Sequence, residues 1–296
     1  MKINGIYPAL LTPFNDDQSI NEDALKELIN HLLSKGVHGL FAIGTNGEFH
    51  ALSFEEKLTV AKIVIEEVDG RVPVMLGAGS NSTIESIKLA KEFEKLGADA
   101  LSVITPYFIS PSQVELQKYF EEIAYATSIP VFLYNIPSKT GVSIEPSTVK
   151  KLAEHSNIYG IKDSSGDFEL IQSYLNETVD QDFAVFAGTD SLILKTLKAG
   201  GQGAIAATAN AIPDNVVAIY NNWKKGLMEE AEEAQQSLQP LRDTFPLSTI
   251  PASLKKAVEL FGIPVGPPRK PVQDVNKETT KIIEKMVESY QTNTNR

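Results

Sequence analysis

Cysteine is absent from the 296 residues, which excludes a disulfide framework, a thiol nucleophile and a metal site with cysteine ligands. Long apolar runs are also absent, so we expect no transmembrane segment, and the first residues lack the apolar region of a signal peptide. Basic residues are few: 27 Lys and Arg stand against 38 Asp and Glu, for a net charge of −11 with no basic cluster. We therefore expect a cytoplasmic protein that binds neither nucleic acid nor a membrane.

Histidine is scarce as well, with four residues in the chain. His31, His38, His50 and His155 are scattered and show no spacing typical of metal ligands. No dinucleotide-binding fingerprint or phosphate-binding loop stands where one is expected. The sequence therefore predicts no metal and no cofactor.

Apolar segments with strand and helix character alternate along most of the chain. Eight such strand–helix pairs end near residue 225 and predict a (β/α)8 TIM barrel over residues 1–225. Residues 226–296 predict a helical extension packed on the barrel. The expected strands cover residues 5–11, 39–43, 72–77, 100–104, 130–134, 158–162, 183–187 and 203–206, and the expected helices cover 21–35, 53–68, 83–96, 113–126, 146–155, 168–178, 191–199, 214–225, 227–241, 252–261 and 277–290.

Local signals support these boundaries. Ser53 and Glu56 form a capping-box pattern at the start of the second expected helix. Gly36, Gly97 and Gly200 each follow a helix and precede a strand, where a glycine at the helix C-terminus is favoured.

Lys162 is the residue that points most directly to chemistry. It ends the apolar segment at residues 158–162, and a polar turn follows it. Lysine is rarely buried without a partner, and burial disfavours the charged form of an amine. A neutral amine at this place predicts a nucleophile that forms a Schiff base with a carbonyl substrate.

Other polar residues gather at the same predicted rim, because functional sites of such barrels form at the C-terminal ends of the strands. Each also has a structural interpretation: a turn for the loop at residues 44–48, a core tyrosine for Tyr134, a loop cap for Asp190, and an ion pair with Asp163 or Asp190 for Lys162. For Glu48 we favour the structural role, since a buried carboxylate often accepts hydrogen bonds from loop N–H groups. The rim residues in question are Gly44, Thr45, Asn46, Gly47, Glu48, Tyr134, Lys139, Lys162, Gly188, Asp190 and Asn210.

The chain resembles the pyruvate-dependent class I aldolases of the dihydrodipicolinate synthase and N-acetylneuraminate lyase family. The resemblance spans the barrel and rests on motifs in order: Gly44-Thr45-Asn46-Gly47-Glu48, Tyr134-Asn135-Ile136-Pro137, Thr140-Gly141 and Gly160-Ile161-Lys162-Asp163. It implies Lys162 as the Schiff-base lysine, Tyr134 as the phenol that shuttles protons, and Thr45 and Asn46 as binders of the pyruvoyl carboxylate. It also implies that the backbone near Ile205 lines the pocket, and that the protein is a homotetramer.

Departures from family patterns concern the aldehyde partner. Dihydrodipicolinate synthases usually have Thr at the position of Asn46, Tyr at the position of Phe108 and Arg at the position of Lys139. A lysine cannot reproduce the bidentate contact that an arginine makes to a carboxylate. N-acetylneuraminate lyases share Gly188 and Asp190, which bind sugar hydroxyls there, but usually carry Glu at position 191 and Ser at position 207, where this chain has Ser and Ala. The chain looks most like 4-hydroxy-2-oxoglutarate and 2-keto-3-deoxygluconate aldolases.

We therefore expect reversible cleavage of a 2-oxo-4-hydroxy acid to pyruvate and an aldehyde. Lys162 condenses with the C2 carbonyl, Tyr134, with Thr45, accepts the C4 hydroxyl proton, and Lys139 and Asp190 contact the rest of the substrate. The alternatives are a synthase that condenses pyruvate with aspartate semialdehyde, a Schiff-base dehydratase or deaminase, a metal-dependent aldolase, and a non-catalytic sensor of 2-oxo acids.

Overall fold

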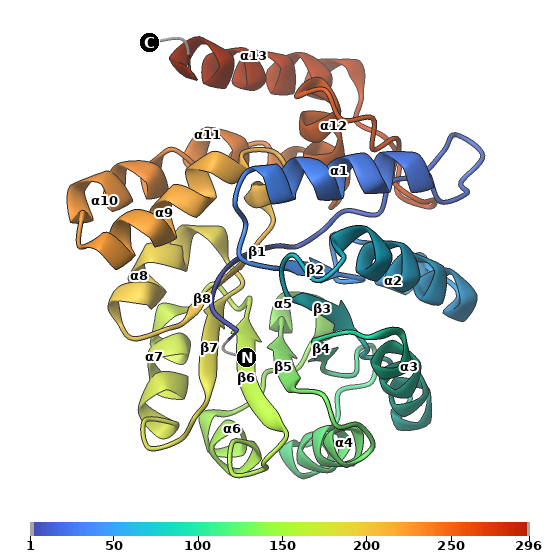
Figure 1. Ribbon diagram of the computed structural model, residues 1–296, viewed down its shortest axis with the longest axis vertical. Helices are drawn as coiled ribbons and strands as arrows, with labels where there is room; N and C mark the ends of the chain where they lie inside the picture. Colours follow the sequence, from blue (N-terminus) through green and yellow to red (C-terminus); the bar gives the residue numbers. More distant parts are fainter. Residues whose placement is uncertain (1–2, 295–296) are drawn as a thin grey trace. The chain divides into compact units, whose positions relative to one another are not determined.

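The structure is a computed structural model that describes residues 3–294. Eight parallel strands form one sheet in the order β1-β8-β7-β6-β5-β4-β3-β2, and the N–H of His38, just before β2, donates to the carbonyl of Ile6 on β1 at 2.9 Å. The sheet is therefore a nearly closed barrel, and the predicted (β/α)8 TIM barrel is confirmed (Figure 1). The strands are β1 (Gly5–Pro8), β2 (Leu40–Ala42), β3 (Val74–Gly77), β4 (Ala100–Ile104), β5 (Val131–Asn135), β6 (Ile158–Asp163), β7 (Ala184–Ala187) and β8 (Gly203–Ala206).

Helices separate the strands along the chain, and more helices follow the last strand. The α-helices are α1 (Glu22–Ser34), α2 (Phe54–Val68), α3 (Thr83–Leu96), α4 (Gln113–Tyr125), α5 (Pro137–Thr140), α6 (Pro146–Leu152), α7 (Phe168–Glu177), α8 (Ile193–Lys198), α9 (Pro213–Lys225), α10 (Met228–Gln236), α11 (Gln239–Arg242), α12 (Ala252–Leu260) and α13 (Lys277–Thr294). Short 3-10 turns are η1 (Phe49–Ala51), η2 (Asp190–Leu192), η3 (Thr208–Asn210) and η4 (Phe245–Leu247). No helix among the described residues is both long and apolar enough to cross a membrane.

The chain divides into two compact units. The first contains the described residues up to Tyr7, His38–Phe41 and Val72–Ala206. The second contains Pro8–Val37, Ala42–Arg71 and the described residues from Ala207 onward. The boundary expected at residue 225, and the packing of an extension on the barrel, remain predictions.

The first unit holds almost the whole sheet, with helices α3, α4, α6, α7 and α8 outside its strands (Figure 1). Aromatic side chains fill its interior: the ring of Phe186 meets those of Tyr7 and Phe132 edge to face, each at 5.9 Å between centroids. All three rings are almost completely buried. Edge-to-face packing of this kind stabilises a core beyond the burial of apolar area alone.

Hydrogen bonds at the helix starts explain why most predicted boundaries hold in this unit. The Ser82 hydroxyl caps α3, and Ser112 and Glu115 form a reciprocal capping box at the start of α4. Helix α3 begins and ends at the predicted residues. The short helix α5 was not predicted, because its four residues, which begin with Pro137, are too few to show helical periodicity.

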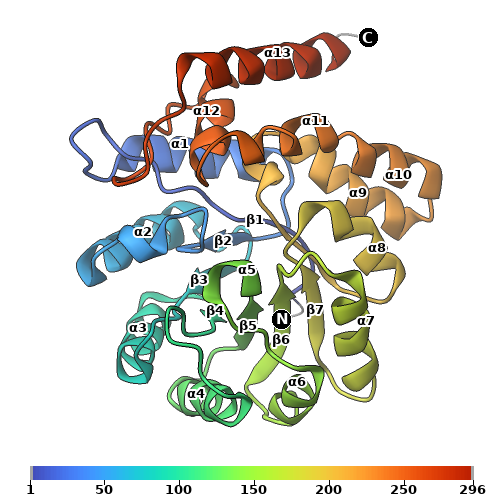
Figure 2. The ribbon, with the colours of Figure 1, turned by 180° about the vertical axis from the view of Figure 1, so that it is seen from behind.

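The second unit contains α1, α2 and α9 to α13. Helix α9 lies beside α10, and α12 lies beside α13 (Figures 1 and 2). The predicted capping box of α2 is present between Ser53 and Glu56. The single helix predicted over residues 227–241 is wrong, because the chain forms α10 and α11 with a break at Ser237 and Leu238. Pro240 explains the break, since proline lacks an N–H group and its ring clashes with the carbonyl four residues earlier.

Candidate active site

Lys162 ends strand β6 beside Tyr134 on β5, and the two residues are paired in the parallel register. The lysine side chain is buried, with only 4 % of the residue exposed. Its Nζ lies 4.0 Å from the centroid of the Tyr134 ring and 4.8 Å from that of the Phe41 ring. Among residues 3–294 the amine makes no hydrogen bond and no ion pair. The structural interpretation, an ion pair with Asp163 or Asp190, is therefore wrong.

Gly188, after β7, leaves the space that the Lys162 side chain occupies. A Cβ atom at Gly188 would lie 2.9 Å from Cε of Lys162, 2.8 Å from the carbonyl oxygen of Asp163 and 2.1 Å from Oγ of Ser164. The Gly188 N–H donates to that Asp163 carbonyl at 2.6 Å, so the backbone is fixed at this close approach. Gly188 therefore shapes the surroundings of the lysine, while its expected role in binding sugar hydroxyls stays a prediction.

Asp163 points its carboxylate into a separate hydrogen-bond network. It accepts from Nδ2 of Asn135 at 2.8 Å, and from both the N–H and the hydroxyl of Ser165, at 3.1 and 2.5 Å. Burial raises the pKa of Asp163 above its usual value. The Asn135 amide also donates to the Tyr174 hydroxyl at 3.3 Å, and burial raises the pKa of that phenol. The network ties the ends of β5 and β6 together, which holds Tyr134 and Lys162 in register.

The remaining predicted residues of the first unit lie after β5, after β7 and within β8. Asp190 opens η2 after β7 and is 6 % exposed, whereas Ile205 is buried within β8. Lys139 lies on α5 and is exposed. The structure thus brings Lys162, Tyr134 and Gly188 into direct proximity, while contacts of Asp190, Ile205 and Lys139 with a substrate stay predictions.

Thr45 and Asn46 belong to the second unit, in the loop that follows β2. Both residues are half-buried. The loop turns back on itself, because the Glu48 N–H donates to the Thr45 carbonyl at 3.1 Å and the Thr12 hydroxyl donates to the Gly47 carbonyl at 2.8 Å. Asn46 also lines a cavity of about 50 Å³ with Ala207 and residues of the C-terminal segment, among them Phe245, Ser248, Ile250, Pro251, Ser253 and Leu254.

Two contributors near Lys162 were missed by the sequence analysis. Phe41 falls within the strand expected at residues 39–43, and no local pattern marks its contact with the lysine. The hydroxyl of Ser164 is buried with no hydrogen-bond partner within the described part of the chain. Its position directly after Asp163 was visible in the sequence, but only the close approach of Gly188 shows that it borders the lysine.

No group of three or more His, Asp or Glu side chains among residues 3–294 stands together as metal ligands would. The groups beside one another that can take part in a reaction here are a buried primary amine, Lys162, and a neighbouring phenol, Tyr134. A primary amine in such surroundings can add to a carbonyl, and a phenol can transfer a proton.

Comparison with known sequences supports a single family. The profile of the dihydrodipicolinate synthetase family matches residues 2–290. A 4-hydroxy-tetrahydrodipicolinate synthase of Methanopyrus kandleri is 44% identical over 284 residues, which cover 95% of this chain and 94% of that protein.

Solved structures agree over the whole fold. Dihydrodipicolinate synthase DapA-2 of Bacillus anthracis superposes with a TM-score of 0.94 at 32% identity and covers 98% of this chain and 99% of its own. YagE, a member of the same family from Escherichia coli K12 that was crystallised in complex with pyruvate, superposes equally well, with a TM-score of 0.94, 32% identity and the same coverage of both chains.

Proposed function

The chain belongs to the dihydrodipicolinate synthetase family, and from this premise we propose that it is a Schiff-base enzyme that joins pyruvate to an aldehyde, or reverses that reaction. The observation that carries the proposal is the Lys162 amine, which is buried beside Tyr134 with no hydrogen bond or ion pair among the described residues. An amine with no hydrogen bond or ion pair has no protein group to displace before it adds to a carbonyl carbon.

The first half of the reaction forms an enamine. The Lys162 nitrogen adds to C2 of pyruvate, and loss of water from the resulting carbinolamine gives a protonated imine. The Tyr134 hydroxyl gives its proton to the hydroxyl that leaves the carbinolamine as water. The imine withdraws electrons, so the Tyr134 oxygen then takes a proton from C3 and the electron pair of that C–H bond becomes the carbon–carbon double bond of the enamine. The loop with Thr45 and Asn46 binds the pyruvate carboxylate in this proposal.

The second half forms the new bond. The enamine carbon attacks the aldehyde carbon, and the aldehyde oxygen takes a proton from the Tyr134 hydroxyl. Water then hydrolyses the imine and releases Lys162. In the reverse direction Tyr134, with Thr45, accepts the C4 hydroxyl proton and the C3–C4 bond breaks. Asp190, Lys139 and the backbone near Ile205 contact the part of the substrate beyond this bond.

For the aldehyde we propose aspartate semialdehyde. The support is the naming of relatives that match nearly the whole chain at 38–44% identity as 4-hydroxy-tetrahydrodipicolinate synthases. This replaces the first expectation from the sequence, cleavage of a 2-oxo-4-hydroxy acid, as the leading proposal.

Cleavage of a 2-oxo-4-hydroxy acid is kept as the second candidate because of Lys139 and Phe108. Lys139 is exposed on α5 and offers one point charge rather than the paired N–H groups with which an arginine holds a carboxylate. Phe108 is 90% exposed and has no hydroxyl to supply. Both features favour an acceptor other than an amino acid semialdehyde.

The experiment begins with borohydride reduction in the presence of pyruvate, followed by mass spectrometry of the peptides. The proposal expects a pyruvate adduct on Lys162 that is absent from Lys162→Ala; an adduct on another lysine, or none, contradicts it. The untreated enzyme is then tested for pyruvate consumption with aspartate semialdehyde, and for pyruvate release from 4-hydroxy-2-oxoglutarate, 2-keto-3-deoxygluconate and N-acetylneuraminate. Adduct formation without carbon–carbon chemistry would point to a dehydratase, a deaminase or a sensor.

We also propose that the protein is a homotetramer, as the family resemblance implies. Phe108 and Ile109, in the loop after β4, are 90% and 73% exposed, and apolar side chains so exposed favour burial against another subunit. Sedimentation of the protein with both residues replaced by serine, compared with the unaltered chain, tests this expectation.

A further inference from the structure

Glu48 holds an unusual place in the second unit. It follows Asn46 by two residues, adopts a left-handed backbone conformation with φ of +56°, and is 1% exposed. Non-glycine residues in this conformation persist only where their surroundings hold them. What holds Glu48 therefore also sets the shape of the Thr45–Asn46 loop, whose Thr45 carbonyl accepts the Glu48 N–H at 3.1 Å.

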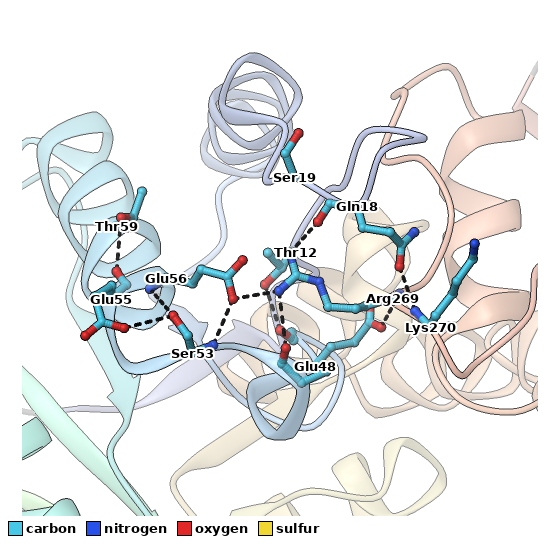
Figure 3. A network of polar contacts seen from close by, with 12 residues as sticks. Thr12, Gln18, Ser19, Glu48, Ser53, Glu55, Glu56, Thr59, Arg269 and Lys270 are labelled. Carbon is cyan, nitrogen blue, oxygen red and sulfur yellow. Dashed lines mark hydrogen bonds and ion pairs between the residues drawn. The ribbon is translucent and has the colours of Figure 1, made fainter.

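Both carboxylate oxygens of Glu48 are held by the C-terminal segment. Oε1 lies 2.8 Å from Nζ of Lys255 on α12, and Oε2 accepts the backbone N–H of Arg269 at 2.8 Å (Figure 3 shows Glu48 and Arg269). The side chains of Glu48 and Lys255 are each 1% exposed. This pair is therefore a buried ion pair, and such a pair stabilises a fold only when hydrogen bonds satisfy its remaining atoms.

Lys255 meets that condition. Its Nζ donates to the Pro267 carbonyl at 2.9 Å and lies 4.2 Å from the centroid of the Phe14 ring. Burial, opposed by the charge of Glu48, lowers the pKa of Lys255 to about 8. The contacts of this amine thus serve the packing of residues 255–269 against the loop.

The side chain of Arg269 also contacts residues that lie before and after the loop in the sequence. Its guanidinium pairs with Glu56 at the start of α2 at 2.7 Å, and donates to the carbonyls of Ala51 and Gln18 (Figure 3). It stacks over Phe14 with 4.3 Å between Cζ and the ring centroid. The same cation therefore joins the C-terminal segment to the chain before the loop, at Gln18, and to the chain after it, at Ala51 and Glu56.

We propose that Lys255 and Glu48 are positioning residues for the pyruvate-binding loop, so that the C-terminal segment sets the affinity for the 2-oxo acid carboxylate from outside the site. The inference rests on the proposed function, in which Thr45 and Asn46 bind that carboxylate. Neither Lys255 nor Glu48 touches substrate; each acts through the backbone of residues 44–48.

The test compares Lys255→Met with a matched control, Lys256→Met. Lys256 is the next residue on α12, and its ion pairs with Glu259 and Asp274 do not involve the loop. The first measurement is the pyruvate dependence of reductive trapping at Lys162. Lys255→Met should raise the half-saturating pyruvate concentration roughly tenfold, with a maximum trapping rate within about twofold of the unaltered protein. Lys256→Met should leave both unchanged.

The second measurement is hydrogen exchange of the backbone amides of residues 44–50, which does not depend on activity. Lys255→Met should speed exchange in this segment and Lys256→Met should not. Unchanged exchange together with unchanged pyruvate affinity in Lys255→Met overturns the inference. If the unaltered protein forms no pyruvate adduct, the proposed function fails, and the exchange result alone still decides whether Lys255 positions the loop.

Glu48→Gln provides a second route if Lys255→Met does not fold. The amide oxygen introduced at position 48 can still accept the Arg269 N–H, and Lys255 can release its proton because its pKa is already about 8. Faster exchange at residues 44–50 and weaker pyruvate binding are expected here too, with smaller changes than in Lys255→Met. A Glu48→Gln protein with the exchange and affinity of the unaltered chain contradicts the inference.

Discussion

Two buried lysines, one in each unit, differ in the polar partners of their amines. Lys162 is 4% exposed and Lys255 is 1% exposed. The amine of Lys162 faces the rings of Tyr134 and Phe41. The amine of Lys255 meets a carboxylate, a carbonyl and a ring.

This difference shows that a shifted pKa does not by itself identify a nucleophile. Lys255 has a pKa lowered to about 8, which taken alone would mark it as an activated amine. Its hydrogen bonds, however, already use the nitrogen, and a carbonyl carbon would have to displace Glu48 or Pro267. Lys162 makes neither kind of bond within the described residues, so no protein group has to be displaced when it adds to a carbonyl carbon.

The sharpest test of this comparison removes each of the two amines in turn. Lys162→Ala should lower turnover by about a thousandfold or more, because no other group can form the imine. Lys255→Met should retain trapping of pyruvate at saturating concentration. The check is borohydride trapping and steady-state kinetics of both variants, and residual turnover above a few per cent in Lys162→Ala would falsify the assignment of the nucleophile.

A substitution at Gly188 should have a smaller effect, and of the two lysines it disturbs Lys162 alone. A methyl group there would lie 2.9 Å from Cε of the lysine and 2.1 Å from Oγ of Ser164, so either the side chain or the backbone has to move. We expect Gly188→Ala to lower the rate of imine formation by about ten- to a hundredfold, because small displacements of a reacting group are costly.

Pre-steady-state trapping of pyruvate measures that loss, and Gly188→Ala combined with Ser164→Ala is the control. Removing the Ser164 hydroxyl relieves the closest of the three contacts and should recover part of the rate. A Gly188→Ala enzyme with an unaltered rate would mean that the lysine has room that the structure does not show.

Much of the fold and the centre of the site could be predicted from the sequence. Apolar periodicity placed every strand near its observed position, since eight repeats of one strand–helix pattern admit few topologies. Lys162 was found because a lysine at the end of an apolar strand is unexpected without a partner. Tyr134 was found because it ends the preceding expected strand at the same rim and matches a motif of the family that the chain resembles.

The surroundings of both lysines could not be predicted. Lys255 looked like any residue of an amphipathic helix, and its partner Glu48 lies far earlier in the chain. Glu48 was expected to be structural and to accept hydrogen bonds from loop N–H groups. Its carboxylate does accept a backbone N–H, that of Arg269, but both of its partners belong to the C-terminal segment. Contacts across such distances leave no local periodicity, so only the folded chain reveals them.

Loss of Lys255 should lower the free energy of unfolding, although it should leave trapping at saturating pyruvate largely intact. Lys255→Met leaves Glu48 buried with only the Arg269 N–H, and removing one partner of a buried ion pair costs about 3–5 kcal/mol. Lys256→Met should cost less than about 1 kcal/mol, because Lys256 is half-buried and the carboxylates left behind, Glu259 and Asp274, are exposed to solvent. Urea unfolding of both variants measures the two values, and the Glu48→Gln/Lys255→Met double variant should recover much of the loss. Equal losses in the two single variants would contradict a buried, coupled pair.

The pH dependence of stability gives the smallest and most specific signal. The folded-state pKa of Lys255, about 8, lies below its ordinary value of 10.5, so between these values the unfolded chain binds more protons. The contribution of Lys255 to the free energy of unfolding therefore rises as pH increases from about 8 to 10.5. Below pH 8 the folded protein bears the full cost of burying the charged amine. The charged groups that bear on it are Glu48, Arg269 and Asp274. Subtracting the urea-unfolding profile of Lys255→Met from that of the unaltered protein isolates the rise, and a flat difference across this window would show that Lys255 titrates normally despite its burial.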